Sequence, residues 1–260
     1  MNRIDFRDQI SSNKTKSFFL ILIVILFIVA LGYVISLAFS PVYFSFIMII
    51  ATIFSILYIV ISYYNSHKIA IASVGAKPAS REKHKMFFDL VEGLTLASGL
   101  PMPKLYVMPS QQINAFASGR NPKKAVICVT EGALNKLDRR ELEGVLAHEL
   151  GHVGNYDIRF ITLVAVLVGM VAIISQIFLR SLFFSGNGGG DKKNAIFIII
   201  GIALAILAPI AVYLVQMSIS RKREYGADAT AVKFTRYPQG LINALEKIKH
   251  EHAPAEKKIS

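Results

Sequence analysis

Long runs of apolar residues alternate with charged segments along this chain. The first apolar run, 17–64, contains no charged residue. It is too long for one membrane crossing and suits two, because each crossing takes about 20 apolar residues. A turn is expected near Ser40-Pro41, since proline disfavours continuation of a helix. The run also exceeds the apolar core of a cleaved signal peptide, so it predicts a membrane anchor.

A second apolar region contains two runs of spanning length, Ile158–Leu179 and Ala195–Met217, joined by a glycine-rich link that is expected to be flexible. The pattern therefore predicts four transmembrane helices in two hairpins, 17–64 and 158–217. Residues 1–16 would form a cytosolic amino terminus.

The polar segments on either side of the second hairpin, 65–157 and 218–260, predict one small α+β domain in two parts. Apolar spacing and turn residues favour a helix within 80–99 and strands within 104–110, 113–119 and 124–130. Asp138 followed by Glu141 is typical of a capping box, which predicts a helix over 139–154. The charged stretch after the second hairpin also has a helical pattern.

Composition agrees with a membrane protein, because 53% of the residues are hydrophobic and the mean hydropathy is +0.49. The formal net charge of +12 is expected to serve topology or lipid contact. No basic motif interleaved with aromatic residues predicts nucleic-acid binding. Cys128 is the only cysteine, which excludes an intrachain disulfide, and we expect it to be a buried strand residue.

The sequence HELGH at 148–152 contains the candidate metal-binding and catalytic residues. Residues four apart lie on one face of a helix, so His148 and His152 can reach one metal ion. This is the HExxH pattern of zinc hydrolases, in which Glu149 would act as general base. A catalytic zinc also needs a third protein ligand, and the sequence must supply it elsewhere.

The best candidate for the third ligand is Glu224, in the charged helical segment after the second hairpin. Asp228 lies four residues later on the same face and would orient a histidine ligand, while Arg221 could orient or neutralise the carboxylates. Glu224 can meet the histidines only if an even number of spans lies between them, and the sequence offers two. The excess of Lys and Arg places these segments in the cytosol.

The stretches HELGHVGNYDIR, SRKREYGADATA and INAFASGRNPKKAVICVTEGAL together closely resemble the HtpX family of membrane zinc metalloproteases, which are related to type I CAAX prenyl proteases. The resemblance covers the whole chain. It implies a predominantly α membrane protein with a small α+β zincin-like metalloprotease domain, one Zn²⁺ held by His148, His152 and Glu224, and catalytic Glu149. It also implies a bacterial inner-membrane location, a cytosol-facing site and membrane-protein substrates handled in quality control and stress response.

Zinc proteases of this kind bind a peptide as an added β-strand, and the predicted strand within 113–119 is the candidate edge. Asn114, Ala115 and Phe116 would bind substrate there. A second donor for the oxyanion is expected, and the sequence leaves Tyr225 and Arg223 open. The oligomeric state is not predicted.

Two other functions fit parts of this pattern. An intramembrane protease of the site-2 type also uses HExxH, but there the motif lies inside an apolar span, whereas Glu141, Glu143, Asn155 and Asp157 flank it here. A transporter or scaffold with a structural zinc would usually close all four metal positions, often with cysteines. One cysteine cannot do that, and Glu149 would then have no evident purpose.

Overall fold

In the computed structural model the described residues are 44–164, 221–252 and isolated positions within 15–29, at 168 and within 201–213. They fall into two compact units. One contains 66–159 and 221–252. The other includes 44–65 and 160–164.

The predicted hairpins lie mostly outside the described residues. Helix α2, Phe44–Ser73, begins three residues after Pro41 and covers the end of the first hairpin. Its described side chains between 46 and 64 are mainly large, apolar and exposed. Among the described residues, no helix combines the length and the apolar character that a membrane crossing requires. The four-span arrangement therefore stays a prediction.

A four-stranded sheet forms the base of the soluble unit, with the order β1-β2-β4-β3. Strand β2 (Lys104–Met108) runs parallel to β4 (Val126–Thr130), and β3 (Ala115–Ser118) pairs antiparallel with β4 at one edge. These three strands confirm the sequence prediction. The two-residue strand β1 (Lys77–Pro78), antiparallel to β2, was not predicted because two residues carry no periodic pattern. Cys128 is fully buried in β4, and burial raises its pKa to about 12, which makes it a structural residue.

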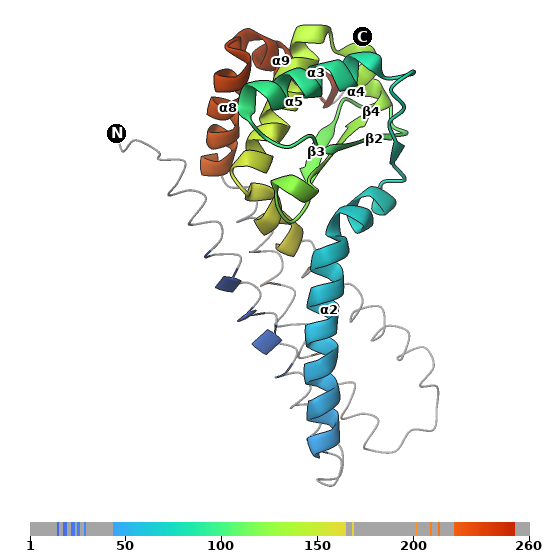
Figure 1. Cartoon of the computed structure of the whole chain (residues 1–260), viewed down its shortest axis with the longest axis vertical. Helices are drawn as coiled ribbons and strands as arrows, with labels where there is room; N and C mark the ends of the chain where they lie inside the picture. The colour runs from blue at the N-terminus through green and yellow to red at the C-terminus, as the bar shows by residue number, and fades with distance from the viewer. Residues whose placement is uncertain are drawn as a thin grey trace, which may run out of the picture. The chain divides into compact units, whose positions relative to one another are not determined.

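Helices cover this sheet, and one of them is central to the packing (Figure 1). Helix α5 (Arg139–Gly154) contacts β3, α3 (Lys85–Ser98), α8 (Arg221–Thr235) and α9 (Pro238–His252). The short helices η2 (Pro122–Lys124) and α4 (Glu131–Lys136) flank β4. The apolar core between sheet and helices is built around the fully buried side chains of Phe87, Val91, Ile127, Leu142, Leu146 and Leu150.

The start of α5 is fixed by its own sequence. The Asp138 carboxylate accepts hydrogen bonds from the backbone N–H groups of Arg140 and Glu141, and the Glu141 carboxylate accepts one from Asp138 N–H at 2.8 Å. This confirms the predicted capping box and the helix limits of 139–154. The same Glu141 carboxylate also pairs with Lys247 of α9 at 2.6 Å, which fastens that helix to α5.

Two glycines let α8 and α9 approach the α5 backbone closely. A Cβ atom on Gly151 would lie 3.1 Å from Ala227 Cα of α8, and one on Gly144 would lie 2.5 Å from Leu241 N of α9. A larger residue at either position would force the helices apart. Gly151, inside HELGH, therefore lets α8 pack against α5 at Ala227. Glu224 lies about one helical turn before Ala227 on α8.

Candidate metal centre and adjoining cavity

Three side chains from α5 and α8 converge on one point. His148 Nε2 and His152 Nε2 lie 3.1 Å apart, and Glu224 Oε2 lies 3.5 Å from the first and 3.7 Å from the second. One ligand atom from each of these residues lies within 4.8 Å of the others. The structure thus brings together the three ligands that the sequence suggested, although about 70 residues separate the two helices.

A carboxylate behind each histidine fixes the direction of its ring. His148 Nδ1 lies 2.9 Å from Asp228 Oδ1, as expected from the helical spacing of Glu224 and Asp228. His152 Nδ1 lies 3.1 Å from Asp157 Oδ2, a partner that sequence reasoning did not identify. An Nδ1–H donated to each carboxylate leaves both Nε2 atoms facing Glu224, which is the usual outer arrangement of a histidine metal site.

Asp157 reaches His152 through a tight turn at the end of α5. Tyr156 adopts φ 60°, in the left-handed region, and the chain folds back so that Asp157 is fully buried. The Asp157 charge also acts on the buried guanidinium of Arg223. Nothing in the sequence between Gly154 and Ile158 marks such a turn, apart from Asn155, a residue type that turns favour.

The charges of the site are strongly coupled. Hydrogen bonding to His148 and His152 lowers the pKa of Glu224 well below its usual range, against a smaller effect of burial. Burial alone lowers the pKa of His152, but its contacts with Asp157 and Glu224 outweigh burial and raise that pKa to about 10. The pKa of His148 is likewise raised, because contacts with Glu224 and the nearby acidic charges outweigh burial. The site therefore concentrates negative charge where a cation would lie.

These residues fit a catalytic zinc site. Two imidazoles and one carboxylate are a known ligand set for zinc hydrolases, and the ring orientations are those that an outer shell of carboxylates produces. The third ligand is only partly buried, with 43% of the Glu224 side chain exposed, which leaves the site accessible from solvent. Metal binding would displace the Nε2 protons.

The basic and aromatic residues near Glu224 differ in their environments. Arg221 is exposed at the beginning of α8, whereas Arg223 is buried. Burial lowers the pKa of Arg223, and the charges of Asp157 and Glu224 oppose that effect. Tyr225 is 65% exposed. The buried Arg223 guanidinium thus interacts electrostatically with Asp157 and Glu224, and the role predicted for Arg221 stays a prediction.

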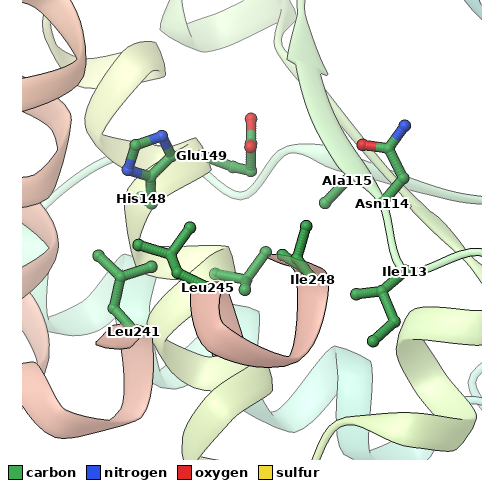
Figure 2. Close-up of a pocket in the computed structure, with 9 residues that line it drawn as sticks. Ile113, Asn114, Ala115, His148, Glu149, Leu241, Leu245 and Ile248 are labelled. Atoms are coloured by element: carbon green, nitrogen blue, oxygen red, sulfur yellow. The ribbon is translucent and has the colours of Figure 1, made fainter. Parts of the chain in front are cut away.

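A cavity of about 430 Å³ adjoins the metal-site residues. Figure 2 shows Glu149 and His148 on one side of it, Asn114 and Ala115 on another, and apolar side chains of α9 on a third. Two of the predicted substrate-binding residues, Asn114 and Ala115, thus lie beside the predicted catalytic glutamate. Phe116 is half-buried on β3 and is not among the residues that line this cavity. The contribution of α9 was not predicted.

Replacing Asp157 with Asn is expected to weaken zinc binding by roughly 10–100-fold, as loss of an outer partner of a histidine ligand usually does. The metal-free protein should also lose about 3 kcal/mol of stability, because buried Arg223 would lose the charge of buried Asp157 and keep only that of the partly exposed Glu224. Zinc titration and denaturant unfolding of the metal-free chain measure the two effects.

Asp228→Asn is the matched control, because 41% of the Asp228 side chain is exposed and it faces the other histidine. It should weaken zinc binding by a similar factor with little change in stability. Equal stability losses in both variants would contradict the role given to Asp157.

Comparison with known proteins places the chain among peptidases. Residues 82–255 match the model of peptidase family M48. The chain is 43% identical over 247 residues to a protease HtpX homolog from Caldanaerobacter subterraneus subsp. tengcongensis, covering 92% of this chain and 81% of the relative. It is 38% identical over 257 residues to a protease HtpX homolog from Dictyoglomus thermophilum, covering 99% and 84%.

A solved structure was also found, the crystal structure of S. mikatae Ste24p. It is 22% identical, with a TM-score of 0.49 over 94% of this chain, and the chain spans 59% of its length.

Proposed function

Because the chain belongs to peptidase family M48, we propose that it is a zinc-dependent protease that cleaves damaged or misfolded membrane proteins at the cytosolic face of a bacterial inner membrane. The family and its HtpX relatives make it a membrane-associated metalloendopeptidase. This family membership excludes the alternative of a non-enzymatic transporter or scaffold. The observation that carries the proposal is the convergence of His148, His152 and Glu224 beside Glu149 and an open cavity.

When bound to the two histidines and Glu224, zinc would supply a Lewis acid and lower the pKa of a water molecule. The protein's own side chains orient the ligands and transfer the proton. Asp157 and Asp228 hold the two imidazoles in the orientation that the metal needs. Glu149, which lines the cavity beside His148 (Figure 2), accepts a proton from the attacking water and delivers it to the leaving amine.

The substrate backbone would be held at the edge of the sheet. Strand β3 is the last strand beside β4, so one of its sides can pair with an extended peptide. Asn114 and Ala115 stand at the beginning of this edge and line the cavity, and Phe116 follows them along the strand. Such pairing requires an unfolded segment of substrate, which is why damaged or misfolded proteins are the proposed targets.

A test compares a destabilised membrane protein with its stable parent, each reconstituted together with the full-length protease. The destabilised form should be cleaved at least about tenfold faster, because local unfolding supplies the extended segment. A chelator should stop cleavage of both, zinc should restore it, and elemental analysis should find one zinc per chain. Equal cleavage of both forms would contradict the proposed substrate class, and chelator-resistant cleavage would contradict the metal mechanism.

A further inference from the structure

Helix α9 supplies an apolar wall to the cavity beside Glu149. Leu241, Leu245 and Ile248 are spaced along one face of α9 and point toward the cavity (Figure 2). Val145, one turn before Glu149 on α5, and Ile113, before β3, complete the apolar lining. A volume of about 430 Å³ lies within the range of about 300–1,000 Å³ typical of ligand pockets, so it can hold a large side chain.

Polar contacts near the end of α9 and close packing near its start hold this wall in place. The Glu251 carboxylate accepts a hydrogen bond from Ile113 N–H at 2.7 Å and pairs with the ammonium group of Lys136. Nearer the start of the helix, Leu241 N lies directly over Gly144 of α5. The cavity is therefore formed before substrate arrives, and its apolar lining lies at a fixed distance from the segment that leads into β3.

The position of Glu149 indicates which substrate residue this cavity receives. In peptide hydrolysis the general base passes its proton to the nitrogen of the residue that follows the scissile bond. Glu149 and His148 line the cavity, whereas His152 and Glu224 are not among its lining residues. The cavity thus lies on the side of the leaving amine.

On this basis, and resting on the proposed peptidase mechanism, we propose that the cavity binds the side chain of the residue immediately after the scissile bond. Because its lining is aliphatic, it selects large apolar side chains at that position. Leu245 is 49% exposed, whereas Leu241 is buried and Ile248 half-buried, so Leu245 is the specificity-determining residue that substrate reaches first. The preferred substrates are therefore extended segments in which a large apolar residue follows the cleaved bond, as in unfolded transmembrane segments.

A peptide series that differs only at the residue after one scissile bond tests this. The full-length protein with zinc should cleave peptides with Leu, Met or Phe there at least about tenfold faster, in kcat/KM, than peptides with Gly or Asp. Leu245→Lys should reduce that preference by about tenfold and favour Asp or Glu instead. The matched control is Ile242→Lys, because Ile242 is similarly exposed on α9 at 46% and is not among the residues that line the cavity.

Binding without turnover gives a second measurement. With the Glu149→Gln protein, a peptide carrying a photoreactive leucine after the scissile bond should crosslink to α9 within 241–248. Crosslinks confined to other segments would overturn the assignment. Zinc-dependent cleavage by the wild-type protein without any preference at that position would also overturn the assignment, and so would a preference that Leu245→Lys leaves unchanged. In all of these cases the proposed protease function would stand. Absence of zinc-dependent cleavage of every peptide would overturn the function and the pocket together.

Discussion

Replacing Glu149 with Gln is expected to lower kcat/KM for peptide cleavage by about 10²–10⁴-fold, the usual contribution of a general acid–base group. Glutamine keeps the size of the side chain and its place beside His148, but it cannot accept a proton from water. Zinc content should stay at the wild-type level, because Glu149 lines the cavity and is not one of the three converging ligands. Peptide kinetics and elemental analysis on the same preparation measure both quantities.

Glu143→Gln is the matched control for this loss. Glu143 lies on the same helix and pairs with Arg140 at 3.5 Å near the surface, where an ion pair contributes little. Its replacement should leave kcat/KM close to the wild-type value. If Glu149→Gln cleaved at the wild-type rate, the general base would have to be another group, and the assignment of the leaving side of the cavity would fail with it.

The residues of the candidate metal site could be predicted from the sequence because they lie in two short segments with helical spacing. The HExxH spacing places two imidazoles on one face of a helix, and Glu224 and Asp228 repeat the same spacing on another. The capping box at Asp138 fixed where the first helix begins. The prediction placed these two helices together because a catalytic zinc needs a third protein ligand. That is a chemical requirement rather than a sequence pattern.

The features that the sequence did not reveal depend on tertiary contacts. Asp157 orients His152 only because Tyr156 takes a left-handed conformation that its residue type does not favour. Helix α9 has the signals of a helix, with Pro238 at its first position and apolar residues at 241, 244, 245 and 248, yet no spacing relates it to the site. Its place beside Glu149 follows from the close approach at Gly144 and from the pairing of Lys247 with Glu141.

Glu224 offers the sharpest test of the metal site, because it is the one ligand that does not come from the HExxH helix. Its Oε2 atom lies 3.5 Å and 3.7 Å from the two Nε2 atoms, and it is the only negatively charged group in the ligand set. Glutamine at this position would retain the shape of the side chain and lose the charge. A neutral amide oxygen is a much poorer partner for zinc than a carboxylate, so the loss should exceed that caused by removing an outer partner.

We therefore expect Glu224→Gln to weaken zinc binding by more than about 100-fold, beyond the roughly 10–100-fold expected for Asp228→Asn one turn later on the same helix. Competition titration against a chelator of known affinity ranks the wild-type protein and the two variants. Peptide cleavage at a fixed free zinc concentration should fall in the same order, because Glu149 remains in place and only occupancy and geometry of the metal change. If Glu224→Gln held zinc as tightly as the wild-type protein, the third ligand would lie elsewhere. The contact of α8 with Gly151 would then serve the packing of the domain and not the metal.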